Sequence, residues 1–314
     1  MDDQHLRLAV KVARLYHERK MKQAQIASEL HISQPRVSRL LKEAALAGIV
    51  RTIVTVPNDI HTDIEDALTE RYGLNDCIVA DAGDSDEEIG AALAGAAATY
   101  LQTTLTGGDT IGISSWSATW LSAVDRLPAF STPVADQVVQ MFGGVGNPAV
   151  QVKATRLIDR LARATGAKAV FFPSPSVLGS NSAAQKLRED PSVISVSSLG
   201  PSLTVSLAGI GSLDPSPLLR ESGNSAQGKD AEKLRALGAV GDVCLRYYDK
   251  DGVFLPSDFD ARLVGMDVET IRSIPRRVAV AGGQAKIAAI RGALLGGWLT
   301  VLITDIHTAR ALLS

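Results

Sequence analysis

The stretch from residue 23 to residue 42, QAQIASELHISQPRVSRLLK, constrains the fold most strongly. Apolar residues recur there at helical spacing in two short runs, within 26–30 and within 37–41. Between the runs, Ser33 is placed to cap the second helix, and Pro35 falls in its first turn, where the helix needs no backbone N–H. The pattern therefore predicts two helices joined by a tight turn, which is a helix-turn-helix.

The outward face of the second predicted helix carries side chains suited to nucleic acid. Amide, hydroxyl and cationic groups of this kind bind base edges and phosphates in the major groove. We therefore predict that the helix binds operator double-stranded DNA, the alternative being an ordinary helical hairpin whose polar face is merely solvated. The predicted DNA contacts are Gln34, Arg36, Ser38 and Arg39, with Lys42 on phosphate.

The flanking sequence supports DNA binding. An amphipathic helix with apolar residues from 6 to 15 supplies a third helix, Gly48 ends the second helix of the pair, and residues 49–56 alternate like a short β-wing. Residues 1–57 contain ten Lys and Arg against five Asp and Glu, although the whole chain has a net charge of −2. A basic head on an acidic body is expected when only one end of a protein meets phosphate.

The chain as a whole has the composition of a globular protein. Its 314 residues exceed one typical domain, with 46% hydrophobic and 21% charged residues. Cys77 and Cys244 are isolated and fit no metal-ligand spacing, which predicts buried thiols in a reducing cytoplasm, without a metal or cofactor. Since the N-terminus lacks an apolar signal core and no apolar run approaches the ~18 residues of a membrane helix, we expect a cytoplasmic protein with no membrane partner.

From residue 75 onward, short apolar runs alternate with helical stretches. This alternation predicts a Rossmann-like α/β fold, a parallel sheet with helices on both faces. A breaker cluster at Pro57-Asn58-Asp59 predicts the domain boundary, with a DNA-binding domain at 1–57 and an effector-binding and oligomerisation domain at 58–314. The predicted strands cover residues 76–80, 110–114, 134–141, 167–172, 203–208, 240–248, 278–281 and 299–303.

Ligands of open α/β sheets bind at the carboxyl ends of the strands, where this chain places hydroxyls, glycines and charges. The loop at residues 114–119, SSWSAT, opens a helix and suits a phosphate, although a plain helix cap uses the same residues. Asp242 lies in an apolar strand and needs a partner, and Lys286 lies in a first helical turn, where a cation suggests an anionic partner. The predicted ligand residues are Ser114, Ser115, Ser117, Thr119, Gln140, Gly211, Asp242 and Lys286.

Seven segments together resemble the SorC/DeoR-type sugar-responsive bacterial transcriptional regulators. They are QIASELHISQPRVSRLLKEA, GDTIGIS…LSAV, VVQMFGGVG, FFPSPSV, LAGIGSLDPS, GAVGDVCLRYYDKDG and RVAVAGGQAKIAAIRGALLGG…VLITD. The resemblance implies an effector domain shared with ribose-5-phosphate isomerase, glucosamine-6-phosphate deaminase and CoA transferases, and a tetramer on operator DNA. It also implies a phosphorylated sugar or sugar-alcohol effector.

The resemblance also implies roles for individual residues. Residues 114–119 correspond to the phosphate loop, Asp242 to the carboxylate that reads sugar hydroxyls, and Lys286 to the lysine that faces the anion. Trp116 departs from the family pattern, in which this loop is shorter and rich in glycine.

Two other functions remain open at this point. A phosphosugar enzyme would share the fold, with Asp214 as the best candidate base beside a turn-forming alternative, but four of the five histidines precede residue 75. A regulator that senses a non-phosphorylated ligand such as a free polyol is the second alternative. We expect a regulator and not an enzyme.

Overall fold

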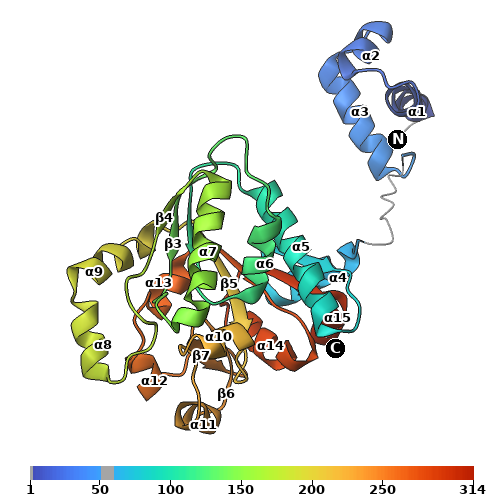
Figure 1. Ribbon diagram of the computed structural model, residues 1–314. Coiled ribbons are helices and arrows are strands. Elements are labelled where there is room, and N and C mark those ends of the chain that lie inside the picture. The colour runs from blue at the N-terminus through green and yellow to red at the C-terminus, as the bar shows by residue number, and fades with distance from the viewer. Residues whose placement is uncertain (1–2, 51–59) are drawn as a thin grey trace. The chain divides into compact units, whose positions relative to one another are not determined.

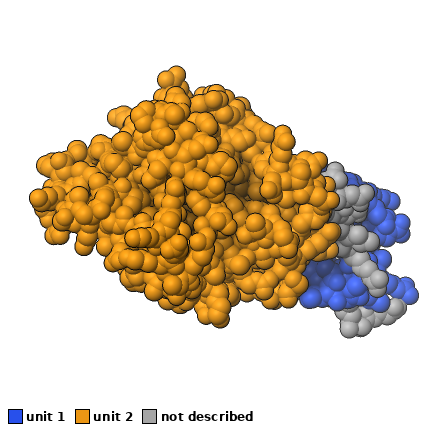
Figure 2. Space-filling model, turned by 60° about the horizontal axis from the view of Figure 1, so that its bottom comes forward, with its two compact units in different colours: residues 1–57 blue, residues 58–314 orange. Residues whose placement is uncertain are grey.

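A computed structural model describes residues 3–50 and 60–314 of the chain. The chain divides into two compact units, Met1–Pro57 and Asn58–Ser314, which are coloured separately in Figure 2. Each unit has its own apolar core among the described residues. The fold class predicted from the sequence, a helical N-terminal region followed by a parallel-sheet domain, is confirmed.

Within residues 3–50, the N-terminal unit contains three helices that enclose a small core. They are α1 (Asp3–His17), α2 (Gln23–Glu29) and α3 (Gln34–Leu46). Leu6 was expected in the apolar stripe of α1, but it lies at the edge of the buried face and is 38% exposed. The core residues are Ala9, Val12, Leu15, Ile26, Val37 and Leu40.

The turn between α2 and α3 and the two ends of α3 follow the predicted pattern in most respects. His31 makes the turn with a φ of 53°, and Pro35 lies in the first turn of α3. Ser33 occupies the cap position, but its side chain forms no capping hydrogen bond. Gly48 follows the end of α3 with a φ of 69°, as a left-handed residue commonly does. Most of the wing predicted at 49–56 lies outside the described residues.

The second unit is built on a nine-stranded sheet, counted over the described residues. Its main path runs in the order β1-β9-β8-β5-β2-β3-β4, and every pair along it is parallel. The antiparallel strands β6 and β7 extend from the end of β5. The strands are β1 (Asp76–Ala80), β2 (Asp109–Ile113), β3 (Ala135–Gln140), β4 (Lys168–Val170), β5 (Val205–Gly211), β6 (Ala239–Val243), β7 (Arg246–Asp249), β8 (Arg276–Val280) and β9 (Val301–Asp305).

Helices cover both faces of this sheet, and each face has its own apolar cluster. On one face α5, α6 and α7 pack next to one another, as Figure 1 shows. On the other, α14 and α15 pack beside α4. The helices are α4 (Thr62–Tyr72), α5 (Asp86–Thr104), α6 (Ala118–Arg126), α7 (Pro148–Thr165), α8 (Asn181–Arg188), α9 (Pro191–Ser197), α10 (Pro217–Glu221), α11 (Lys229–Ala236), α12 (Asp258–Ala261), α13 (Val268–Ser273), α14 (Ile287–Leu295) and α15 (Ile306–Leu313), with short 3₁₀ turns η1 (Gly200–Ser202) and η2 (Gln284–Lys286).

The single strand predicted at 240–248 is wrong, because the chain reverses in its middle. Cys244 and Leu245 adopt left-handed φ values of 53° and 64°, and Val243 pairs with Arg246 across the resulting two-residue turn. Turns of this kind usually require Gly or Asn, and neither is present to mark the reversal in the sequence. The hairpin formed by β6 and β7 therefore could not be read from the usual turn signals.

Cys77 and Cys244 are both buried and free, as predicted. No helix in the described part of the chain is long and apolar enough to cross a membrane. Within residues 3–50 and 60–314, no group of three or more His, Cys, Asp and Glu side chains is arranged to hold a metal ion.

Candidate ligand cavity and recognition helix

A cavity lies at the point where the order of the strands reverses. From β2 the chain continues outward through β3 and β4, whereas from β5 it continues to β8 and β9 on the other side. The carboxyl ends of β2 and β5 therefore form the crevice in which α/β proteins bind ligands. The cavity has a volume of about 100 Å³, and its walls come from the loops after β2, β5 and β8 and from the turn between β6 and β7.

The amino end of α6 forms one wall. Ser117 caps this helix by accepting a hydrogen bond from the N–H of Trp120 at 3.2 Å. The indole of Trp120 is fully buried and donates to the carbonyl of Ala208 on β5 at 2.8 Å, which fixes the helix against the sheet. First-turn N–H groups have no acceptor within their own helix, so those of Ala118 and Thr119 are available to a ligand. This end of α6 can bind an anion.

Asp242 supplies a buried carboxylate to the opposite wall. Its Oδ2 accepts the N–H of Leu245 at 2.9 Å, whereas its Oδ1 has no hydrogen-bond partner among the described residues. Burial raises the pKa of Asp242 to about 6, against the lowering effects of the Leu245 N–H and the charge of Lys286. A Cβ at Gly211 would collide with Oδ1, so the absence of a side chain there makes room for the carboxylate.

Lys286 approaches the cavity from η2, immediately before α14. Its Nζ donates to the carbonyl of Ile210 at 3.0 Å. Burial lowers the pKa of Lys286, and the negative charges of Asp242 and Asp86 partly reverse this effect. The ammonium group is therefore held at the cavity wall by the Ile210 carbonyl, within the electrostatic influence of Asp242, with N–H donors to spare for a ligand.

The structure brings together six of the eight residues predicted to bind a ligand. The cavity lining includes Ser114, Ser117, Thr119, Gly211, Asp242 and Lys286.

Ser115 and Gln140, however, do not line this cavity. Ser115 is fully buried and donates to the carbonyl of Phe142 at 3.1 Å, and Gln140 accepts the N–H of Phe172 at 2.6 Å. Both side chains use their polar atoms to hold the loops after β3 and β4. The direction of a side chain at a strand end depends on the local turn, which the sequence pattern does not give.

Several lining residues were not predicted from the sequence. Trp116 is 3% exposed, and its indole N–H has no partner among the described residues. The only sequence signal for this residue is that an aromatic side chain interrupts a hydroxyl-rich loop. Asp214, which the sequence offered only as a candidate base for an enzyme, also lines the cavity, but its carboxylate is exposed and lies 3.6 Å from the guanidinium of Arg235. Further lining residues that were not predicted include Phe142, Cys244, Leu245, Ser216 and Leu219.

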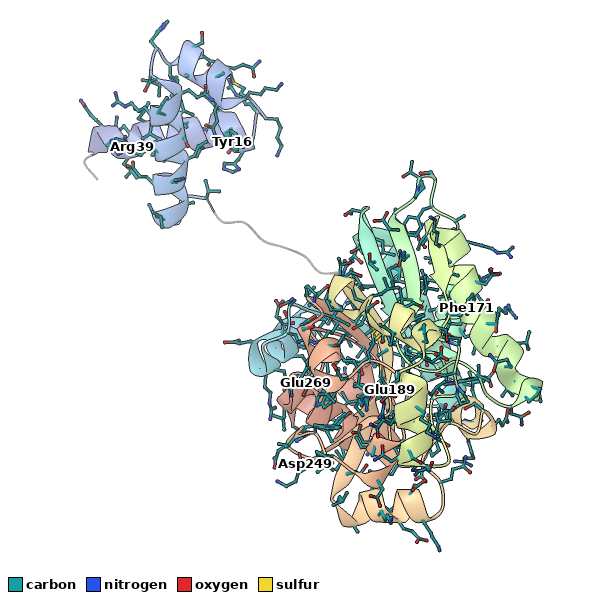
Figure 3. All side chains as sticks on the ribbon, turned by 90° about the vertical axis from the view of Figure 1, so that its left-hand side faces the viewer. Tyr16, Arg39, Phe171, Glu189, Asp249 and Glu269 are labelled. Atoms are coloured by element: carbon teal, nitrogen blue, oxygen red, sulfur yellow. The ribbon has the colours of Figure 1, made fainter. Side chains whose placement is uncertain are left out.

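The outer face of α3 presents the residues predicted to contact DNA. Gln34, Arg36, Arg39 and Lys42 are exposed, and Ser38 is half-buried. None of them forms an ion pair with another residue of the described ranges. Figure 3 labels Arg39 on this unit. Three cationic groups therefore lie on the surface of this helix with no charge partner in the part of the chain that the structure describes.

Sequence comparison relates the whole chain to known proteins. Residues 57–314 match the family described as "Putative sugar-binding domain". The chain is 31% identical over 315 residues to the deoxyribonucleoside regulator of Bacillus subtilis (strain 168), covering 100% of this chain and 99% of that protein. It is 30% identical over 311 residues to the erythritol catabolism regulatory protein EryD of Brucella abortus (strain 2308), covering 98% of this chain and 96% of that protein.

Structural comparison gives the same relationship. The crystal structure of the full-length sorbitol operon regulator SorC from Klebsiella pneumoniae matches with a TM-score of 0.72 and 28% identity, covering 99% of this chain and 100% of that one. These relatives are named as regulators and not as enzymes, which confirms that part of the expectation. The chain belongs to the SorC/DeoR family of sugar-binding transcriptional regulators.

Proposed function

We propose that this regulator controls a carbohydrate or polyol operon and that a phosphorylated sugar or sugar alcohol is its effector. The observation that carries the proposal is the convergence of a buried acceptor on Asp242, the ammonium group of Lys286 and the amino end of α6 on one cavity. The names of the relatives refer to deoxyribonucleosides, sorbitol and erythritol, which are all polyhydroxylated compounds or contain a sugar.

The effector would bind with its charged and neutral ends at different walls. Its phosphate would accept the N–H groups of Ala118 and Thr119 and the hydroxyl of Ser117, because a helix amino terminus favours an anion. Its hydroxyl groups would donate to Oδ1 of Asp242, a buried acceptor that has no donor among the described residues. Lys286 would then lie between the Asp242 carboxylate and the anionic end of the effector.

The N-terminal unit would bind operator DNA in the cytoplasm, with α3 in the major groove. We propose that Gln34, Arg36, Ser38 and Arg39 contact base edges and that Lys42 contacts a phosphate. A homodimer or homotetramer would present two such helices to a palindromic operator, since the symmetry of the site mirrors that of the protein. The effector would change operator affinity by the ratio of its own affinities for the two states of the protein.

A non-phosphorylated polyol is the second candidate effector, and the charges at the cavity favour it. Lys286 is the only cation among the described lining residues, whereas two carboxylates, those of Asp214 and Asp242, lie in the same lining. A dianionic phosphate would have to overcome this imbalance through the amino end of α6 and the loop hydroxyls. A neutral polyol would need only the hydrogen-bond donors and acceptors.

One ligand panel separates the two candidates. Thermal unfolding of the full chain would be followed with pentose 5-phosphates, hexitol 6-phosphates and tetritol 4-phosphates, each beside its free counterpart. A ligand at a hundred times its dissociation constant stabilises the native state by about 2.7 kcal/mol. Stabilisation by the phosphorylated member of a pair alone supports the first proposal, and stabilisation by the free member alone supports the second. If no member has an effect, both effector classes are rejected.

A gel-shift titration tests the DNA-binding half of the proposal. The probe is the DNA upstream of the operon that contains this gene, at low salt, with any stabilising compound added in parallel. An Arg36→Ala, Arg39→Ala double variant serves as the control for binding through α3. Absence of a shift by the unmodified protein at low salt, where phosphate contacts are strongest, would reject the proposed operator binding.

A further inference from the structure

The Gly282-Gly283 loop, which precedes Lys286, is hydrogen-bonded to a carboxylate outside the cavity. Asp305, the last residue of β9, accepts the N–H of Gly283 through Oδ2 at 2.9 Å. The same N–H also donates to the hydroxyl of Thr308 at 2.8 Å, and that hydroxyl donates to Asp305 Oδ2 at 2.6 Å. A Cβ at Gly282 would collide with this carboxylate, so the loop packs directly on it.

These hydrogen bonds determine where Lys286 can lie. The carbonyl of Gly283 accepts the N–H of Lys286 at 3.0 Å, which makes the tight turn that leads into α14. Both Asp305 and Thr308 are buried. Although burial acts to raise the pKa of Asp305, the hydrogen bonds from Thr308 and Gly283 lower it overall, so the carboxylate is ionised at neutral pH. The loop is therefore held by a charged acceptor that does not itself line the cavity.

Asp305 is also the residue from which α15 begins. Its Oδ1 caps the helix by accepting the N–H of Thr308 at 2.9 Å. The carboxyl end of α15 is bound by α4, because Tyr72 donates to the carbonyl of Leu312 at 2.8 Å and Arg71 donates to that of Leu313. Helix α4 is the first helix of the second unit, and in the sequence it directly follows the segment that leads from the N-terminal unit.

We propose that Asp305 is a positioning residue for Lys286 and that α15 transmits the state of the Gly282-Gly283 loop to α4. A change at Lys286 would move Gly283, alter the hydrogen bonds at the start of α15 and reach the bonds between α15 and α4. The inference rests on the proposed function, because binding of the effector is the expected cause of a change at Lys286. The hydrogen bonds that join the Gly282-Gly283 loop to α15, and α15 to α4, are present without an effector, so the transmission can be tested separately.

Two substitutions weaken these hydrogen bonds while leaving most of α15 intact. In Asp305→Asn the amide oxygen can still cap α15, because Asn is a good capping residue, but its NH₂ group meets the N–H of Gly283, donor against donor. Thr308→Val removes the second acceptor for that N–H, and Thr308→Ser retains it. Asp267→Asn is the matched control, because Asp267 caps α13 through the N–H of Thr270 at 2.7 Å and accepts no hydrogen bond from a distant loop of the described chain.

Hydrogen exchange of the full chain without ligand provides the decisive measurement. For Asp305→Asn and Thr308→Val we expect exchange to become about tenfold faster in residues 282–286 and also in α4, because loss of a buried acceptor frees the loop. Thr308→Ser and Asp267→Asn should leave both segments unchanged. Faster exchange confined to the loop, or equal acceleration in the control, would overturn the proposed transmission. If Asp305→Asn does not fold, Thr308→Val against Thr308→Ser decides alone.

A second measurement concerns the positioning of Lys286. Calorimetry with inorganic phosphate should show about tenfold weaker binding to Thr308→Val than to Thr308→Ser, since a displaced ammonium group loses a charged hydrogen bond. Equal affinities would overturn the positioning role. Failure of the unmodified protein to bind phosphate or any sugar phosphate would refute the proposed effector class instead, and the exchange of α4 would still decide the transmission.

Discussion

One oxygen of the Asp242 carboxylate accepts the N–H of Leu245 at 2.9 Å, while the other, beside Gly211, has no partner among the described residues. The carboxylate thus holds the tight turn between β6 and β7 and offers an acceptor to the cavity. A buried acceptor without a donor costs free energy, and a ligand hydroxyl can recover it. Stability and ligand binding are therefore linked through one side chain.

The pH dependence of stability should report on Asp242. Because burial raises its pKa from the ordinary 3.8 to about 6, the folded state binds this proton more tightly than the unfolded state. The contribution of the group to stability therefore falls as pH rises from about 4 to about 6, by about 3 kcal/mol in total, and stays low above pH 6.

Urea unfolding of the wild type and Asp242→Asn between pH 4 and pH 8 measures this effect. The three tryptophans all lie in the second unit, so their fluorescence follows the relevant domain. The difference between the two proteins should change between pH 4 and pH 6 and be constant at higher pH. A difference that does not vary with pH would show that Asp242 titrates normally.

Lys286→Met should weaken binding of an anionic effector by about tenfold or more, because a charged hydrogen bond contributes roughly 1.5–3 kcal/mol. Folding should be little affected, since burial already disfavours the charged lysine, as its lowered pKa indicates. Isothermal titration with the stabilising compound measures the affinity. Lys250→Met, at an exposed lysine paired with Asp251, is the control. Equal losses in both variants would argue against a role for Lys286.

Substitutions on α3 should separate base contacts from phosphate contacts. Arg39→Ala is expected to weaken specific binding by about 1–3 kcal/mol and to relax the preference for operator sequence, whereas Lys42→Ala should reduce the slope of log K against log salt by about 1. Fluorescence anisotropy at several salt concentrations gives both quantities. Lys186→Ala on α8 is the control. An unchanged salt slope for Lys42→Ala would place that lysine away from the DNA backbone.

The strained turn at Cys244 gives a prediction about stability. With a φ of 53°, this residue occupies a conformation that costs a side chain about 1 kcal/mol and glycine almost nothing. Cys244→Gly and Cys244→Ala both remove the buried thiol, so their difference isolates the backbone effect. We expect the glycine variant to be more stable by about 1 kcal/mol in urea unfolding. A more stable alanine variant would mean that the turn is not strained there.

The alternation of strands and helices was predictable because the central strands are short, largely buried apolar runs and the helices that cover them present apolar residues to the sheet. The helix-turn-helix was predictable for a similar reason, since its core residues recur at helical spacing. The hairpin of β6 and β7 was not, because Cys244 and Leu245 adopt left-handed angles without glycine. Tertiary packing stabilises that turn, through burial of both residues and the hydrogen bond from Leu245 to Asp242.

Within the site, residue types were easier to predict than their directions. Asp242 and Lys286 could be proposed because a charge in an apolar strand or at a helix start needs a partner. Ser115 and Gln140 have equally suitable chemistry, but they turn toward the loops after β3 and β4. Asp305 gave no signal, because its partner Gly283 is 22 residues away and only the pairing of β8 with β9 brings them together.

The adjacency of β2 and β5 at the centre of the sheet has a consequence for how such proteins diversify. The crevice exists because the backbone departs from these two strands in opposite directions, whatever side chains surround it. Substitutions in the neighbouring loops can therefore change which metabolite fits without disturbing the hydrogen bonds between β2 and β5. The same backbone arrangement can thus serve regulators that respond to different small molecules.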